Sequence, residues 1–338
     1  MITKKILGIV IVGYIGFSFF ALRSYAAFPK KLLTLPHYFF QHTCAFPAFG
    51  NARCHAQVVV NKDGKPSATP SIPLGAYGPL QFHTAYQLPC TPGGSVSGTC
   101  STPPVFSKII GIVDAYQDPT LENDLAVYNT AYNLPSCTVA NGCLSIVNQN
   151  GGTSLPQVDS GWALEESLDT QIAHAMCQTC KIVVVETNSS SLSDLATGVA
   201  TAARLGAQAI SNSYGGSEFY GELVYDNYYN HPGVAVTVSS GDSGYGTEYP
   251  ATSPDVVAVG GTTLRLYSDN SYAGETAWSS TGSGCSFYEP ANAWQTGLPN
   301  WGAMYCFQKR GVADISADAD PNTGAAVYDT TPYYGQSG

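Results

Sequence analysis

Two acidic side chains lie at a spacing that places them together on one helix. Glu165 and Asp169 are four residues apart in the segment GWALEESLDTQIAHAMC (161–177), so on a helix they stand one turn apart on the same face. An apolar stripe that begins at Leu164 runs beside them. Two carboxyl groups at this spacing can share a proton and act as a general base. The alternative interpretation is a solvated helix face without a chemical role.

A third carboxylate, Asp242, follows an apolar run. The run VAVTVSSG (234–241) leads into the turn SSGDSGYG (239–246), which contains Asp242. Parallel α/β sheets place their sites at the carboxyl ends of their strands. If 234–241 is a strand, Asp242 lies at the edge of the sheet where such sites form.

Predicted strands and helices alternate along the chain. Short runs that are apolar throughout are typical of parallel strands covered on both faces, and they occur at 109–116, 144–149, 181–187, 207–214, 234–241 and 256–262. One helix is expected to start with Asp118 as N-cap and Pro119 at its first position, and another to start at Ser191. The alternation predicts an α/β fold, a doubly wound and mostly parallel sheet with helices on both faces.

Charge is sparse and acidic in this sequence. Charged residues make up 11% of the 338 residues, against about 25% in an average globular protein. The formal net charge is −10 and the pI is about 4.9. A chain of this sign is a poor partner for nucleic acid or anionic lipid, so neither is expected as a partner.

The first residues have the pattern of an export signal. Two lysines precede an apolar run over 6–22, and Ser24-Tyr25-Ala26 follows with small residues at its two ends, as at the cleavage site of a secretory signal peptide. We expect a signal peptide at 1–26, a short pro-segment or N-terminal arm at 27–75 and the main domain at 76–338. The protein is then secreted or periplasmic, with no stable membrane association after cleavage. An uncleaved membrane anchor is the alternative interpretation.

Ten cysteines fit an exported, oxidised protein. They fall into five close pairs, and five local disulfides are the simplest interpretation, although the sequence does not fix the connectivity. The pairs are Cys44 and Cys54, Cys90 and Cys100, Cys137 and Cys143, Cys177 and Cys180, and Cys285 and Cys306. Cys177 and Cys180 would need a second pair of ligands to form a zinc site, and no such pair stands out.

Several motifs together resemble the sedolisin (serine-carboxyl peptidase) family, which has a subtilisin-like fold. The family's Trp-x-x-Glu-x-x-x-Asp helix is matched by Trp162, Glu165 and Asp169. An Asn-Ser-Tyr-Gly-Gly strand is matched at 212–216 and a Ser-Gly-Asp-Ser-Gly turn at 240–244. The segments IVDAYQDP, AVGGTTL and RGVADISADADPNTG extend the resemblance from about Tyr77 to the C-terminus.

This resemblance implies a role for each carboxylate. Glu165 would be the general base for a serine hydroxyl, Asp169 would orient it, and Asp242 would donate to the oxyanion when protonated. The substrate strand would be Ser213, Tyr214 and Gly215. A carboxylate base with an ordinary pKa near 4.3 works best in acid. Glu166 is the rival base, but its spacing to Asp169 does not match the four-residue step of the family.

The nucleophile of the family is not found in place. Gly152-Thr153-Ser154 has the right letters but precedes the carboxylate helix, and Gly261-Thr262-Thr263 has threonine instead of serine. Asp242-Ser243 in GDSG imitates a chymotrypsin-like turn, with His174 as a partner, but the parallel-strand pattern opposes that fold. The sequence is therefore interpreted as ending before the nucleophile, and the family's calcium ligands are expected in the same missing segment. No metal or cofactor is expected in residues 1–338.

The sequence predicts a secreted serine-carboxyl endopeptidase that acts on polypeptides at acidic pH, inactive as it stands because the nucleophile is missing. The alternative function is a non-catalytic remnant that binds peptides.

Overall fold

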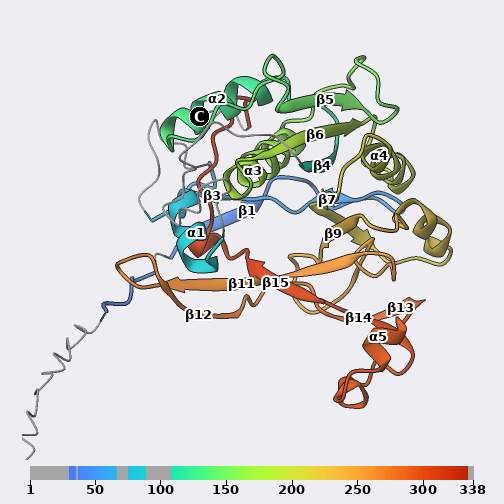
Figure 1. Cartoon of the computed structure of the whole chain (residues 1–338). Helices are drawn as coiled ribbons and strands as arrows, with labels where there is room; N and C mark the ends of the chain where they lie inside the picture. The colour runs from blue at the N-terminus through green and yellow to red at the C-terminus, as the bar shows by residue number, and fades with distance from the viewer. Residues whose placement is uncertain (1–29, 36, 67–74, 89–107, 334–338) are drawn as a thin grey trace, which may run out of the picture. The chain divides into compact units, whose positions relative to one another are not determined.

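The computed structural model describes residues 30–35, 37–66, 75–88 and 108–333 (Figure 1). All elements below belong to the unit that begins at Lys31. The predicted signal peptide at 1–26 and the cysteines at 90 and 100 lie outside the described residues. In the part of the chain that is described, no helix combines the length and apolar character needed to cross a bilayer.

Eight described strands form the central sheet. Their order is β12-β11-β9-β7-β4-β6-β5, with β15 paired to β11, and β12 runs antiparallel to β11 while the other pairs are parallel. The strands are β4 (Lys108–Ala115), β5 (Leu144–Asn148), β6 (Cys180–Thr187), β7 (Ala209–Asn212), β9 (Ala235–Ser239), β11 (Val257–Leu266), β12 (Tyr272–Ala277) and β15 (Ile315–Asp318). Each predicted apolar run coincides with one of these strands, whereas β12 and β15 were not predicted.

Helices surround this sheet in Figure 1. The α-helices of the described residues are α1 (Pro79–Tyr86), α2 (Leu121–Ala131), α3 (Ser160–Met176), α4 (Leu192–Arg204) and α5 (Ala293–Thr296). Three short 3-10 helices are η1 (Glu222–Tyr228), η2 (Trp301–Met304) and η3 (Pro321–Thr323). The carboxylate helix α3 and the helix α4 lie where the sequence predicts them, and the Ser191 side chain caps α4 by accepting from the Asp194 amide.

Helices α2 and α4 cover opposite faces of the sheet. Ile112 of β4 belongs to the same buried cluster as Leu125 of α2, and its neighbour Val113 belongs to the same cluster as Leu195 of α4. Successive side chains of a strand point to opposite faces, so these helices lie on the two sides of β4. The doubly wound α/β prediction is confirmed.

The start of α2 differs from the prediction. The helix begins at Leu121 with Thr120 at the N-cap position, not at Asp118. The Asp118 carboxylate instead accepts hydrogen bonds from the Thr120 amide at 2.9 Å and the Ser167 hydroxyl at 2.9 Å. Because Asp118 anchors α3 as well as the turn, helical geometry begins two residues later than local sequence preference indicates.

The N-terminal arm contains strands that the sequence did not predict. β1 (Phe39–His42) pairs antiparallel with β3 (Gln57–Val60). Between them, β2 (Arg53–Cys54) pairs antiparallel with β8 (Tyr214–Ser217), which pairs in turn with β10 (Glu248–Tyr249). The arm is therefore joined by backbone hydrogen bonds to the strand predicted to bind substrate.

Four of the five predicted cysteine pairs are disulfides in the structure. They join Cys44 to Cys54, Cys137 to Cys143, Cys177 to Cys180 and Cys285 to Cys306. The last closes the loop between β13 (Gly284–Pro290) and β14 (Lys309–Val312), which form a separate antiparallel pair. The bridge between Cys177 and Cys180 agrees with the interpretation of this pair as a structural disulfide.

The contact between α4 and the sheet gives a test of the fold. A methyl group added at Gly198 would lie 2.7 Å from Val113 Cγ1 and 2.8 Å from Thr187 Cγ2. We expect Gly198→Ala to lower the free energy of unfolding by about 1–3 kcal/mol, since overpacking a close-packed core costs that much. Denaturant unfolding measures it. Gly302→Ala, where the methyl group meets nothing within 4 Å, is the matched control, and equal stability of both variants would contradict the packing.

Candidate active site

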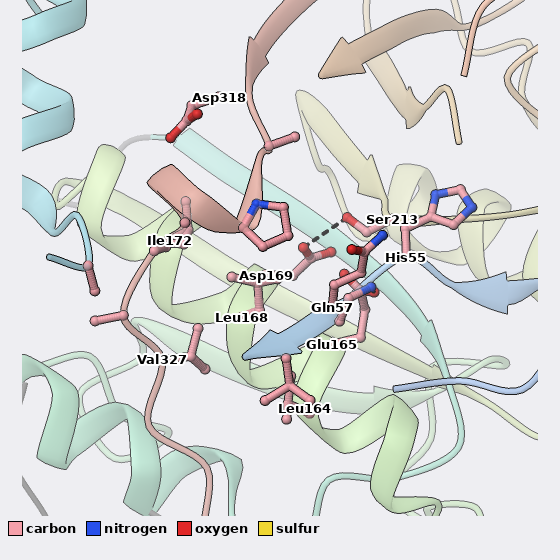
Figure 2. A pocket seen from close by; sticks show the side chains of 18 of the residues that line it. His55, Gln57, Leu164, Glu165, Leu168, Asp169, Ile172, Ser213, Asp318 and Val327 are labelled. Atoms are coloured by element: carbon pink, nitrogen blue, oxygen red, sulfur yellow. Dashed lines mark hydrogen bonds between the residues drawn. The ribbon is translucent and has the colours of Figure 1, made fainter. Parts of the chain in front are cut away.

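Helix α3 presents Glu165 and Asp169 on one face. The Asp159 side chain caps the helix by accepting from the amides of Gly161 and Trp162, which fixes where the helix starts. Glu165 is only 1% exposed. Figure 2 shows both carboxylates beside the apolar side chains of Leu164 and Leu168, all lining one cavity. The structure thus places the predicted pair as the helical spacing requires.

Each carboxylate of the pair has one described hydrogen-bond donor. The Ala56 amide of the N-terminal arm donates to Glu165 Oε2 at 2.5 Å. The Ser213 hydroxyl donates to Asp169 Oδ1 at 2.8 Å, the contact drawn as a dashed line in Figure 2. Asp169 Oδ2 has no partner among the described residues. The two acids are thus held by different parts of the chain.

Burial changes the acidity of this pair. Burial raises the pKa of Glu165 well above its ordinary value, and the nearby charges of Asp169 and Asp114 raise this pKa further. Burial also raises the pKa of Asp169 to about 6, although the Ser213 hydrogen bond opposes the shift. The expectation of an ordinary pKa near 4.3 was therefore wrong for this state, because the arm and the helix exclude water from both groups.

Glu166, the rival base, belongs to a different group of acids. It is fully buried, and burial together with the charges of Glu186, Asp118 and Asp114 raises its pKa. Burial raises the pKa of Glu186 to about 8. The two Glu166 carboxylate oxygens have no hydrogen-bond donor among the described residues. The pKa of Glu166 thus responds to the acids of the sheet, whereas the charge of Asp169 raises the pKa of Glu165.

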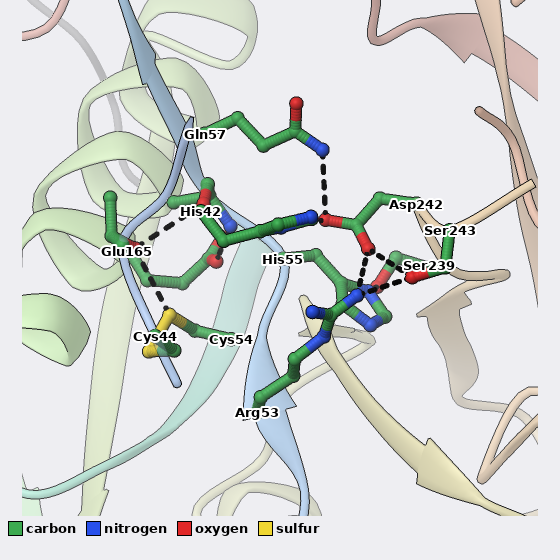
Figure 3. A network of polar contacts seen from close by, with 12 residues as sticks. His42, Cys44, Arg53, Cys54, His55, Gln57, Glu165, Ser239, Asp242 and Ser243 are labelled. Carbon is green, nitrogen blue, oxygen red and sulfur yellow. Dashed lines mark hydrogen bonds and ion pairs between the residues drawn. A yellow bond between two sulfur atoms is a disulfide. The ribbon is translucent and has the colours of Figure 1, made fainter. Parts of the chain in front are cut away.

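Asp242 lies in the same cavity but in a different electrostatic environment. Arg53 Nη2 lies 2.6 Å from its Oδ1, His42 Nδ1 lies 2.9 Å from its Oδ2, and the Gln57 amide donates to Oδ2 at 3.1 Å (Figure 3). Burial alone would raise the pKa of Asp242. The hydrogen bond from His42 and the charges of His55 and Arg53 outweigh burial and lower the pKa to about 2. In this arrangement Asp242 is an ionised acceptor, not the protonated donor that the resemblance implies.

The predicted substrate strand carries an extended segment of the chain itself. Arg53 lies opposite Gly215 and Cys54 opposite Tyr214 in an antiparallel register, and the His55 amide donates to the Ser213 carbonyl at 3.0 Å. Residues Ser213, Tyr214 and Gly215 therefore do pair with a polypeptide backbone. Sequence reasoning missed this part of the site. The only local signal in the arm is the cysteine pair at 44 and 54.

The other hydroxyl candidates lie elsewhere. Ser154 is exposed in the loop after β5, and the Thr263 hydroxyl donates to Asp320 Oδ2 at 2.7 Å. Ser243 lies 2.5 Å from Arg53 Nη2, while the buried His174 ring faces the Pro135 carbonyl at 2.9 Å. The chymotrypsin-like alternative fails, since its histidine does not face its serine and the central sheet is mostly parallel.

Two acidic groups in the described residues have the spacing of cation ligands. In the first group, carboxylate oxygens of Asp118, Asp124 and Asp329 lie within 4.8 Å of one another. In the second, a ring nitrogen of His55 and carboxylate oxygens of Asp242 and Glu248 lie within the same distance. Threonine hydroxyls donate to Asp118 and Asp124, and Arg53 occupies Asp242. Protein donors therefore already satisfy both groups in part.

Fold and site together define a class of protein, one with a subtilisin-like α/β fold and a buried carboxylate pair beside a strand that pairs with an extended segment. The sequence profile of the Subtilase family matches residues 157–328. The chain belongs to the subtilase family of serine peptidases.

The chain is similar to two known proteins, sedolisin and kumamolisin. It is 37% identical to sedolisin from Pseudomonas sp. (strain 101) over a region covering 31% of this chain and 20% of sedolisin. It is 30% identical to kumamolisin from Bacillus sp. (strain MN-32), covering 75% of this chain and 47% of kumamolisin. The chain thus spans less than half the length of these relatives.

A solved structure agrees with these relationships. Pseudomonas sedolisin, a serine-carboxyl proteinase complexed with two molecules of pseudo-iodotyrostatin, superposes with a TM-score of 0.60 at 26% identity. The match covers 78% of this chain and 74% of the sedolisin chain. The resemblance to the sedolisins and the subtilisin-like fold are confirmed.

The buried acids predict how stability depends on pH. Asp169 and Glu186 have pKa values of about 6 and about 8 in the fold against about 4 when unfolded. The unfolded state therefore releases protons first, and the free energy of unfolding should fall as pH rises from about 4 to 8. Each group contributes a slope of up to about 1.4 kcal/mol per pH unit within its own window. The lowered pKa of Asp242 acts only below about pH 4.

Urea unfolding at a series of pH values measures this slope. Glu186→Gln, which stays neutral, should flatten the fall between about pH 5 and 8, whereas Asp63→Asn, at an exposed position of the arm, should leave it unchanged. A stability that rises over this interval would contradict the burial of these acids.

The ion pair between Arg53 and Asp242 gives a third prediction. Both side chains are nearly buried, at 7% and 4% exposed, so removing the Arg53 guanidinium leaves the buried Asp242 carboxylate with the weaker support of His42 and Gln57. We expect Arg53→Gln to lower the free energy of unfolding by about 3–5 kcal/mol and to raise the pKa of Asp242. Chemical unfolding and carboxyl NMR titration measure the two effects. Adding Asp242→Asn should recover part of the loss, and a purely additive double variant would contradict the pair.

Proposed function

We propose that this domain has the chemistry of an acid serine-type endopeptidase that acts on polypeptides. The observation that carries the proposal is the extended segment on β8. Its backbone pairs with Tyr214 and Gly215, and the Ala56 amide, two residues after Cys54, donates to the buried carboxylate of Glu165. A cleft that holds an extended backbone against a proton-accepting pair is suited to peptide-bond hydrolysis.

The proposed roles follow from the position of each acid. Once the arm has left the cleft and Glu165 is ionised, Glu165 accepts the proton of a serine hydroxyl during attack on the carbonyl carbon, and Asp169 shares the accepted proton with it. Asp242 stabilises the oxyanion by donating a hydrogen bond. That role requires a protonated Asp242, so the Arg53 and His42 contacts must be released first. Secretion through the signal at 1–26 remains part of the proposal.

Our proposal assigns the serine nucleophile to none of residues 1–338. Among the described residues, the Ser213 hydroxyl donates a hydrogen bond to Asp169 and not to Glu165. The described hydrogen-bond donor to Glu165 is the backbone amide of Ala56. We propose that the nucleophile belongs to a segment outside this sequence, together with the calcium ligands expected from the family.

A peptide-holding protein without turnover is the second candidate. The observation in its favour is the occupied cleft, in which Arg53 keeps Asp242 ionised. An ionised Asp242 repels an oxyanion and cannot donate to it. In this state the site holds an extended segment and lacks the electrostatics for catalysis.

Hydrolysis of a labelled denatured protein between about pH 3 and 5, where carboxylates titrate, tests the proposal. We expect no turnover by residues 1–338. A longer product of the same gene that adds a Gly-Thr-Ser segment should hydrolyse the substrate and lose at least about 100-fold in rate on Glu165→Gln, since general base catalysis contributes that much.

Three outcomes would contradict this assignment. Hydrolysis by residues 1–338 that Ser213→Ala abolishes would make Ser213 the nucleophile. Hydrolysis that survives Glu165→Gln would remove Glu165 as base. An inactive longer product would favour the peptide-holding protein. Glu122→Gln is a matched control, since its carboxylate accepts from the Val139 amide in a distant part of the sequence.

A further inference from the structure

The residue of the arm that precedes Ala56 has its side chain enclosed. His55 precedes Ala56, whose amide reaches Glu165, and the His55 side chain is only 7% exposed. Gly215, Ser239 and Glu248 contact it, and together with Gly241, which lies against Glu248, they form what we call the His55 site. Strands β8, β9 and β10 supply three of these residues, and Gly241 follows β9. The Asp242 carboxylate, paired with Arg53, lies within 4.8 Å of the ring.

Both nitrogens of the His55 ring face hydrogen-bond acceptors. Nε2 lies 2.9 Å from Glu248 Oε2 and Nδ1 lies 2.6 Å from Ser239 Oγ. The Ser239 hydroxyl also lies 3.4 Å from the Asn212 carbonyl. The Glu248 carboxylate thus presents a negative charge to one edge of the enclosed ring, where a positively charged side chain forms a charge-assisted hydrogen bond.

Two glycines make room for this arrangement. A Cβ atom at Gly215 would lie 2.5 Å from Glu248 Oε2 and 3.1 Å from His55 Cε1. Gly241 has a φ of +111°, and a Cβ atom there would lie 3.2 Å from Glu248 Cδ. A side chain at either position would displace the Glu248 carboxylate. The two glycines thus leave the space that the Glu248 carboxylate occupies beside the His55 ring.

We propose that the His55 site is a subsite that selects a cationic side chain, that of arginine, lysine or protonated histidine, from the polypeptide in the cleft. This inference rests on the proposed function, and it assigns the selected residue to the amino side of the bond that faces Glu165. His55 is the internal occupant. A neutral side chain would leave the Glu248 carboxylate without its cationic partner, and an acidic one would meet the same-sign charge of Glu248.

Small-molecule rescue tests the selectivity without requiring hydrolysis. His55→Ala in the full chain empties the site, and methylguanidinium or its neutral analogue methylurea is then titrated with a metal chelator present. We expect a saturable rise in melting temperature with methylguanidinium only, and none with the wild-type protein. Adding Glu248→Gln should weaken binding at least about tenfold, since it removes a charge-assisted hydrogen bond, whereas adding Glu122→Gln should not. Equal binding of both probes, or no effect of Glu248→Gln, would overturn the proposal.

A second measurement covers the case in which His55→Ala does not fold. His55→Arg and His55→Met are compared by hydrogen exchange at the amides of residues 53–56. The arginine variant should keep the protection of the wild type, and the methionine variant should exchange at least about tenfold faster. Equal protection in both variants would overturn the proposal. If the His55 site selects cations but no longer product hydrolyses a polypeptide, the proposed function fails and the subsite stands. If a longer product hydrolyses polypeptides without preference for a basic residue, the subsite fails and the proposed function stands.

Discussion

The pairing of β2 with β8 is the interaction on which the rest of the site depends. It places the Ala56 amide on Glu165, the His55 ring on Glu248 and the Arg53 guanidinium on Asp242. The backbone hydrogen bonds set the register, and the register decides which side chain meets which acid. A slip by one residue would turn each of these side chains to the opposite face. The electrostatics of the cleft therefore follow from the alignment of a two-residue strand.

The same pairing creates two opposite environments a few residues apart. Around Glu165 and Asp169 the neighbours are backbone, apolar side chains and other acids, so burial favours the neutral carboxyl. Around Asp242 the arm supplies cationic and hydrogen-bond-donating groups, so the charged carboxylate is favoured. Three acids of one cavity thus hold different protonation states at the same pH, and what separates them is the arm.

The sequence could predict what depends on local pattern. The six apolar runs gave the sheet, and the four-residue step from Glu165 to Asp169 gave one face of α3, because strand and helix periods are properties of neighbouring residues. Even there, the start of α2 moved from Asp118 because a side chain of another helix, Ser167, shares its carboxylate. Motif resemblance placed Asp242 and the substrate strand in the site.

The arm could not be predicted in this way. Its contacts with Glu165, Asp242 and Glu248 join residues 109, 189 and 193 positions apart, and β2 is too short to show an alternating pattern. The ordinary pKa values assumed for the acids failed for the same reason, since burial by a distant segment is not a local property.

Because the arm and the cleft belong to one polypeptide chain, the arm competes with external polypeptides for the cleft at every protein concentration. A tethered segment acts at an effective concentration of the order of millimolar, and the bridge from Cys44 to Cys54, ten residues apart, closes a loop within the arm and limits the conformations of the arm when it is away from the cleft. Any external polypeptide binds only the fraction of molecules in which the arm is away, so its apparent dissociation constant is the intrinsic one divided by that fraction. The affinity of this cleft is thus set as much by how often the arm leaves as by the contacts the cleft can make.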